Sequence, residues 1–173
     1  MSFRNRIDSW GLGARTLHWT MAVLFVLQWL AGEFDDLFGG RGFHISLGLT
    51  LAALTMLRIV WRLANPTPAL PASSPAWERL AAKCTYAAWY VLMIALPITG
   101  VACVQAKGKI ASWFGIFAVP EFITADKAFA HTLEECHETL AIAMLAVFAL
   151  HTAAALKHHY IAKDRILLRM LRG

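Results

Sequence analysis

Two histidines stand 14 residues apart in an otherwise apolar segment. His137 begins the stretch HETLAIAMLAVFALH and His151 ends it. In an α-helix, 14 residues make about four turns and about 21 Å, and return to within about 40° of the same face. The two imidazoles are therefore expected on one face of a helix at two heights. A neutral imidazole nitrogen is a common metal ligand, although either residue alone also fits a hydrogen-bonded histidine at a membrane surface.

Two more histidines lie near the ends of other apolar stretches. His18 is close to the start of the first stretch, and His44 begins the second. If the stretches cross a membrane in alternating directions, His44 lies level with His137, and His18 lies level with His151. Paired imidazoles suit haem iron, because a helix on each side of the porphyrin offers one nitrogen.

A bare metal ion is a poorer match to these pairs. Zinc or copper would need three or four ligands at one level, with help from carboxylates or thiolates. Each level holds two histidines and no intramembrane acid. The sequence therefore predicts two haem sites, with four histidines as the metal ligands: His18, His44, His137 and His151.

Four apolar stretches are expected to position these histidines. They cover about residues 14–32, 42–63, 86–104 and 137–156, each near the roughly 20 residues that span a bilayer as a helix. Of the 173 residues, 58% are hydrophobic and only 16% are charged, against about a quarter charged in soluble domains. The prediction is an all-α protein of one domain, residues 1–173, folded as a transmembrane four-helix bundle in contact with lipid.

The segments between these stretches carry their own predictions. Prolines and serines are expected to keep residues 64–83 from forming a helix, with the tail AWERLAAK along the membrane surface. TADKAFAHTLEE is expected to extend the fourth helix outward, with Thr124 as its cap. Pro97 and Gly100 are expected to interrupt the third helix, either to make space for a cofactor or as tolerated residues.

Lys and Arg are unevenly distributed along the chain. Twelve of the 16 lie in the N-terminal segment, the loop after the second stretch and the C-terminal tail. The two other loops hold only Arg41, Lys107, Lys109 and Lys127, together with eight of the eleven acids. By the positive-inside rule both termini are expected in the cytoplasm. The net charge of +5 is therefore not taken as a sign of nucleic-acid binding. The polar N-terminal segment is not expected to be a secretory signal.

Two residues of the second stretch support a haem site. Gly48, one turn after His44, leaves room for a flat macrocycle, or serves ordinary helix packing. Arg58 is 14 residues after His44 and therefore on the same face. It suits a haem propionate, or its side chain extends to the cytoplasmic surface.

The three cysteines say little about function. Cys84, Cys103 and Cys136 are expected to be free thiols, although Cys103 and Cys136 lie on the same side and could pair. Covalent haem attachment is not expected, because Leu133 stands where a Cys-x-x-Cys-His motif needs cysteine.

The chain resembles the bacterial cytochrome b561 family. The resemblance rests on LHWTM, FHISLGLTLAALTMLR, ALPITG and CHETLAIAMLAVFALHTAAALKHHY in the four stretches, with PTPALP and LLRML outside them. It implies a four-helix cytochrome of the bacterial inner membrane with two b-type haems, exchanging electrons with ubiquinone. It also implies that His18 and His151 ligate the inner haem, and that His44 and His137 ligate the outer haem.

The resemblance further implies a membrane oxidoreductase that transfers electrons from superoxide, or another small periplasmic donor, to ubiquinone. Lys107, Lys109 and Arg41 are the outer cations that would steer an anionic donor. His158, two turns beyond His151, is expected to contact the quinone or donate a proton to it, or to be an ordinary interfacial histidine. His131 and His159 are expected at the surface.

Two other functions remain open at this point. One is a cytochrome b subunit that links a partner dehydrogenase to the quinone pool. The other is a haem-free transporter or scaffold with histidines in a proton path. A homodimer through helix faces is compatible with the sequence.

Overall fold

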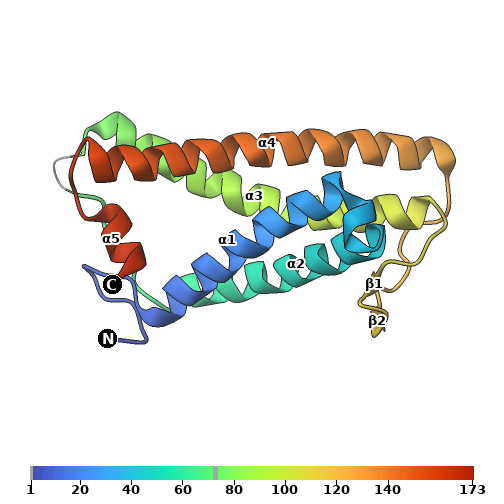
Figure 1. The fold of residues 1–173 in the computed structure, drawn as a ribbon, viewed down its shortest axis with the longest axis horizontal. Helices are drawn as coiled ribbons and strands as arrows, with labels where there is room; N and C mark the ends of the chain where they lie inside the picture. Colours follow the sequence, from blue (N-terminus) through green and yellow to red (C-terminus); the bar gives the residue numbers. More distant parts are fainter. Residues whose placement is uncertain (1, 72–73) are drawn as a thin grey trace.

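The computed structural model describes residues 2–71 and 74–173. Four long helices run along the molecule: α1 (Leu12–Glu33), α2 (Arg41–Leu63), α3 (Ala76–Ala106) and α4 (Lys127–Tyr160) (Figure 1). A short 3-10 helix, η1 (Asp35–Phe38), joins α1 to α2. Strands β1 (Ser112–Trp113) and β2 (Phe117–Ala118) form an antiparallel hairpin before α4, and α5 (Ile166–Leu171) follows α4. Both termini lie at one end, here named the terminal end; the opposite end, with η1 and the start of α4, is the distal end (Figure 1).

The helices pack in three neighbouring pairs, α1 on α2, α2 on α3 and α3 on α4. Buried side chains are mostly small, such as Ala31, Ser46 and Thr55, and many large apolar side chains point outward, including Val23, Val60 and Ile94. An exterior this apolar belongs in lipid rather than in water.

Three helices in the described part of the chain are long and apolar enough to cross a membrane: α2, α3 and α4, with mean hydropathy of 1.7, 2.0 and 2.0. The prediction of a helical membrane protein is confirmed. Helix α1 has 22 residues but is not among the three. Its polar residues, including Arg15, His18 and Gln28, lower its hydropathy, so a crossing by α1 stays a prediction.

Helix α3 begins at Ala76, well before the predicted residue 86. The segment AWERLAAK therefore forms its first two turns, so the prediction of no helix in residues 64–83 was wrong from Ala76 onward. Pro75 precedes the first helical residue, and Glu78 in the first turn interacts favourably with the positive end of the helix dipole. Of the loop predicted to be non-helical, residues 72–73 lie outside the described residues.

Helix α3 also continues through Pro97 and Gly100, so the predicted interruption was wrong. A membrane helix tolerates proline, because neighbouring helices and hydroxyl side chains hold the local backbone. Here α3 packs along α4, and the Thr99 hydroxyl donates to the Ala95 carbonyl at 2.9 Å.

The predicted extension of the fourth helix is confirmed, since α4 begins at Lys127 and has 34 residues. Its cap is Asp126 rather than Thr124, which was the wrong choice. The Asp126 carboxylate accepts a hydrogen bond from the Phe129 amide at 3.0 Å. A carboxylate at this position also interacts favourably with the positive end of the helix dipole.

Candidate functional site

Two histidine pairs lie between the helices at two levels. At the distal level, the ring centres of His44 on α2 and His137 on α4 are 6.3 Å apart. At the terminal level, those of His18 on α1 and His151 on α4 are 6.1 Å apart. These are the two pairs that the depth of the residues predicts. A metal bonded at about 2 Å to one nitrogen of each of two facing imidazoles separates their ring centres by about 6 Å.

The hydrogen bond of His44 fixes its tautomer. Its Nδ1 lies 3.0 Å from the Gln28 carbonyl, which only accepts, so Nδ1 carries the proton. The lone pair is therefore on Nε2, the nitrogen available for a metal. In this structure the Gln28 side-chain amide lies 3.2 Å from Nε2 and donates to it.

The Gln28 amide also accounts for Gly48. A methyl group at Gly48 would come within 3.1 Å of the Gln28 side-chain nitrogen, so the glycine leaves room for that amide. The Gln28 side-chain oxygen is buried without a hydrogen-bond partner in the described residues. A buried amide with one of its two polar atoms lacking a hydrogen-bond partner suits a site that a bound group normally fills.

His137 is held in the same way from α3. Its Nδ1 lies 3.0 Å from the Thr99 hydroxyl, whose own proton goes to the Ala95 carbonyl. Thr99 therefore accepts and His137 Nδ1 donates, which leaves the lone pair on Nε2. Hydrogen bonds of this kind orient the imidazole ligands of metal sites.

Two glycines leave space for the distal rings. A Cβ at Gly32 on α1 would stand 2.9 Å from the His44 ring, and one at Gly100 on α3 would stand 3.1 Å from the His137 ring. Gly32 was not predicted to be part of the site, and Gly100 was predicted only as a residue that makes space for a cofactor or is tolerated. The available signal was their position, since each lies in an apolar stretch at the depth of the distal histidines.

Aromatic residues surround the terminal-level pair. The Trp89 ring centre is 6.0 Å from that of His151, and Phe25 and Phe148 pack with Trp89 in one cluster. The indole N–H of Trp89 is buried and has no acceptor among the described residues. A buried donor without a partner suits an acceptor supplied by a bound group.

The Arg58 side chain points into the interior of the helix bundle, toward His18, rather than toward the surface. Its guanidinium nitrogen Nη2 lies 3.4 Å from His18 Nδ1, and the side chain lies beside Tyr90. In the described part of the chain no carboxylate pairs with it. A half-buried cation without an anion fits the propionate of a haem.

The donor set fits haem better than a bare metal ion. Within residues 2–71 and 74–173, no three His, Cys, Asp or Glu side chains gather as a metal site. Two imidazoles at each level are the ligands that b-type haem uses, and in both distal rings Nε2 carries the lone pair that would bind iron. The residues present therefore fit the group.

His158 lies at the terminal end between two acidic side chains. Its Nδ1 is 2.5 Å from the Asp164 carboxylate, and its Nε2 is 3.9 Å from that of Glu78, which also pairs with Lys157. The side chain of His158 is largely buried. His158 therefore belongs to a local charged cluster and does not extend freely into the interface.

The other two histidines differ from each other. His131 is exposed and lies 3.7 Å from the Glu135 carboxylate, which confirms its predicted surface position. His159 is half-buried, with its ring centre 4.7 Å from that of Tyr160, so it is less exposed than predicted.

Two of the three predicted steering residues are paired with acids at the distal end. Lys107 lies 2.6 Å from the Glu134 carboxylate, and Arg41 lies 3.6 Å from Glu134 and 3.3 Å from Asp35. Lys109 is exposed and has no ion pair within the described residues. Of the three predicted steering residues, Lys109 therefore keeps the least compensated charge.

The cysteines are free in this structure. Cys103 is buried, with its sulfur 3.7 Å from the Ala130 carbonyl, whereas Cys84 and Cys136 are exposed. The prediction of free thiols is confirmed, and Cys103 and Cys136 do not pair.

Comparison with known proteins gives the same family over almost the whole chain. Residues 9–173 match the model of the family described as prokaryotic cytochrome b561. The chain is 33% identical to "Cytochrome b561 homolog 2" of Escherichia coli K12, over 99% of this chain and 95% of that protein. It is 36% identical to "Probable superoxide oxidase CybB" of Yersinia pestis, over 90% of this chain and 91% of that protein. It is 28% identical to "Cytochrome b562" of Cereibacter sphaeroides, over 91% of each chain.

The family match, the apolar helices and the histidine pairs agree with one another. The chain therefore belongs to the prokaryotic cytochrome b561 family, whose members are membrane oxidoreductases that bind haem b and transfer electrons.

Proposed function

We propose that this cytochrome holds two haem b groups and carries electrons from periplasmic superoxide to ubiquinone. The single observation that supports this most strongly is the pair of imidazole pairs, with ring centres 6.3 Å and 6.1 Å apart at two levels. His44 and His137 would hold the outer group, and His18 and His151 the inner one. A haem with two imidazole ligands supplies one-electron transfer and has no open position for oxygen.

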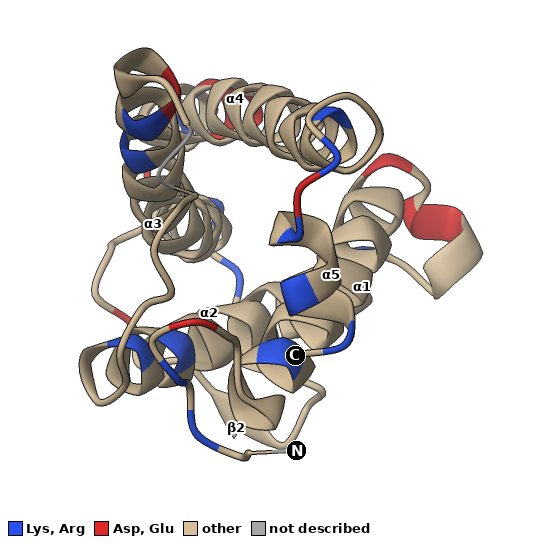
Figure 2. Cartoon of the chain, turned by 90° about the vertical axis from the view of Figure 1, so that its left-hand side faces the viewer, with Lys and Arg blue, Asp and Glu red and all other residues tan. Residues whose placement is uncertain are grey.

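The proposed topology is a transmembrane four-helix bundle in the bacterial inner membrane, with both termini in the cytoplasm. Charge supports this direction. Lys and Arg gather at the terminal end, on the helix ends and on α5, as the view onto that end shows (Figure 2). Acidic residues predominate at the distal end, among them Asp35, Asp36 and Glu134. The positive-inside rule then assigns the terminal end to the cytoplasm.

Residues next to the histidines would help to bind haem at both levels. The Gln28 carbonyl and the Thr99 hydroxyl keep Nδ1 of the distal histidines protonated, so that Nε2 stays available. For His44 Nε2 to bind haem iron, the Gln28 side chain must give up its hydrogen bond to Nε2 and adopt another rotamer. At the inner level Arg58 would pair with a propionate, and the Trp89 N–H is available as a further donor.

Superoxide is proposed as donor on two grounds. One relative bears the name of a superoxide oxidase. The second is Lys109, an exposed cation at the distal end that attracts an anion toward the His44 level. The paired cations Arg41 and Lys107 contribute less, because Glu134 offsets their charge.

His158 is proposed to serve ubiquinone at the cytoplasmic face. The Asp164 carboxylate, 2.5 Å from Nδ1, orients its ring. Reduction of a quinone to a quinol consumes two protons, so a histidine that holds and releases a proton suits this end. Family membership removes the haem-free transporter or scaffold from consideration.

The test uses the purified full-length protein. Superoxide should reduce its b-type haems, and ubiquinone should then reoxidise them and accumulate as ubiquinol. Reduction of the haems only in the presence of a partner dehydrogenase would contradict the superoxide proposal and favour the role of a cytochrome b subunit.

A further inference from the structure

The β1–β2 hairpin lies beside α2 and not beyond the distal end of the molecule (Figure 1). Two hydrogen bonds fasten it there. The Ser46 hydroxyl donates its proton to the Gly42 carbonyl at 2.8 Å and accepts from the Phe114 amide at 2.9 Å, with the Ser112 carbonyl 3.3 Å away. The indole N–H of Trp113 donates to the Thr50 hydroxyl at 3.0 Å. The hairpin is therefore attached to the side of a membrane-spanning helix.

The attachment points lie deep along α2. Arg41 begins the helix and pairs with Asp35, which places water and headgroups at that level. At 1.5 Å per residue, Ser46 is about 7 Å and Thr50 about 13 Å further along the axis. The headgroup region on each side of a bilayer is only about 5–8 Å thick. Both attachment points therefore reach or pass the boundary of the hydrocarbon region.

The composition of this segment suits hydrocarbon. Residues 110–120, IASWFGIFAVP, contain no charged side chain, and Lys109 and Glu121 flank them directly. Ile116 is 77% exposed, Phe117 57% and Phe114 48%. Exposed apolar side chains of this size, three within four residues, are unfavourable in water.

Several backbone amides of the hairpin have hydrogen-bond acceptors within the protein, as a position in the membrane requires. Non-helical backbone at membrane depth must have its polar groups satisfied by protein. Besides the strand pairing, the Ile116 amide donates to the Trp113 carbonyl at 2.9 Å, and the Val119 amide donates to the Ala111 carbonyl at 2.8 Å. The Phe114 amide at the turn donates to the Ser46 hydroxyl of α2, so protein groups accept all three of these amide protons.

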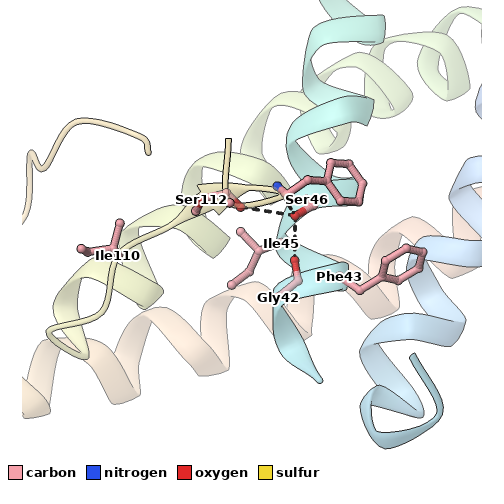
Figure 3. Close-up of a pocket in the computed structure, with 8 residues that line it drawn as sticks. Gly42, Phe43, Ile45, Ser46, Ile110 and Ser112 are labelled. Carbon is pink, nitrogen blue, oxygen red and sulfur yellow. Dashed lines mark hydrogen bonds between the residues drawn. The ribbon is translucent and has the colours of Figure 1, made fainter. Parts of the chain in front are cut away.

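A groove lies between the hairpin and the start of α2, beside the contact at Ser46. It has a volume of about 300 Å³, and its lining includes Phe43, Ile45, Ser46, Ile110 and Phe114 (Figure 3). Because the groove continues the apolar outer surface of α2, its surroundings in the membrane are lipid chains.

We propose that residues 110–119 form a re-entrant hairpin inserted into the distal leaflet, with Phe114, Ile116 and Phe117 against lipid acyl chains and an acyl chain in the groove. This role requires only that α2 spans the membrane, and it is independent of the electron donor and of the acceptor.

Spin labels test the position of the hairpin in the haem-loaded protein, reconstituted in phosphatidylcholine nanodiscs after replacement of the three cysteines by alanine. A label at Ile116→Cys should collide with oxygen several-fold more than with a water-soluble nickel chelate, as should one at Ile94→Cys on the outer face of α3. A label at Lys109→Cys, one residue before the hairpin segment, should favour the nickel chelate. If the Ile116 label behaves like the Lys109 label, the hairpin lies in water and the proposal is wrong.

The unsubstituted protein offers a second measurement that does not depend on those variants. A phosphatidylcholine with a photoreactive acyl chain should label the tryptic peptide 110–127, as well as peptides of α2 and α3. Labelling of the helices without this peptide would overturn the proposal. Haem content and ubiquinone reduction, measured on the same sample, report on the proposed function separately.

Discussion

Thr99 of α3 accepts a hydrogen bond from His137 of α4 over 3.0 Å, so a hydroxyl on one helix sets the tautomer of an imidazole on another. The same carbonyl that keeps α3 regular, that of Ala95, takes the proton of Thr99 and leaves it only the accepting role. The availability of His137 Nε2 thus depends on two helices and on their register.

Thr99→Val should weaken the distal haem site. The valine keeps the shape of threonine but removes the acceptor for His137 Nδ1, and loss of such a partner typically costs about 10–100-fold in affinity. Haem transfer to apomyoglobin would measure this loss. Thr85→Val is the matched control, because its hydroxyl bonds only within α3, to the Ala81 carbonyl. Equal haem retention in both variants would show that Thr99 has no part in the site.

Gly32→Ala should disturb the distal site without unfolding the helix. The added methyl group would lie 2.9 Å from the His44 ring and force the ring to shift. We expect a changed low-spin electron paramagnetic resonance signal for one haem and partial loss of that haem. Gly42→Ala is the control, since nothing lies within 4 Å of its added methyl and alanine favours a helix by up to about 1 kcal/mol. An unchanged spectrum in Gly32→Ala would refute the close contact.

Arg58→Gln should lower the reduction potential of the terminal-level haem. A nearby cation favours the reduced state, which carries one positive charge fewer, and the Arg58 guanidinium lies 3.4 Å from His18. Potentiometric titration followed in the visible spectrum would resolve the two haems. Arg62→Gln is the control, because Arg62 stacks on Tyr86 and Tyr90 instead. A shift of equal size in both variants would mean that only general surface charge matters.

Asp164→Asn should slow ubiquinol formation several-fold and leave haem content unchanged. The neutral amide replaces the carboxylate that holds the His158 ring in place at 2.5 Å. Stopped-flow measurement of haem reoxidation by ubiquinone would detect the change. Asp8→Asn, an exposed acid paired with Arg6 at the same end, should have no effect. A normal rate in Asp164→Asn would remove His158 from the proposed quinone site.

Lys109→Gln should reduce the rate of reaction with superoxide, and the rate of the unsubstituted protein should fall with ionic strength. Attraction between an exposed cation and a small anion is screened over about 10 Å at 0.1 M salt. Pulse radiolysis at low and at moderate salt would measure both effects. Lys127→Gln, at the start of α4, tests whether any distal cation acts in the same way. A rate independent of salt would eliminate electrostatic steering.

The pairing of the histidines was predictable because a bilayer limits how apolar helices can be arranged. Once apolar stretches are taken as crossings, sequence position gives depth, and depth alone pairs His44 with His137 and His18 with His151. The helix boundaries were less predictable. Pro97 was expected to interrupt the third helix, whereas α3 continues through it, and α3 also begins ten residues earlier than predicted.

The partners of the histidines were not predictable from the sequence. Gln28 and Thr99 are ordinary residues until the relative rotation of the helices is known, and the sequence alone does not fix that rotation. The same holds for Gly32, which faces His44 only because α1 packs on α2. The position of the hairpin depends on Ser46 and Thr50, whose hydroxyls could equally have bonded only within their own helix.

The ratio of haem to protein tests the two-level arrangement most directly. Pyridine haemochrome analysis should give two haems per chain for the unsubstituted protein, and one for each of His137→Ala and His151→Ala. The haem that remains should have a different reduction potential in the two variants, because each removes a ligand from a different level. Two haems in His137→Ala, or none in the unsubstituted protein produced with ample haem, would contradict the arrangement.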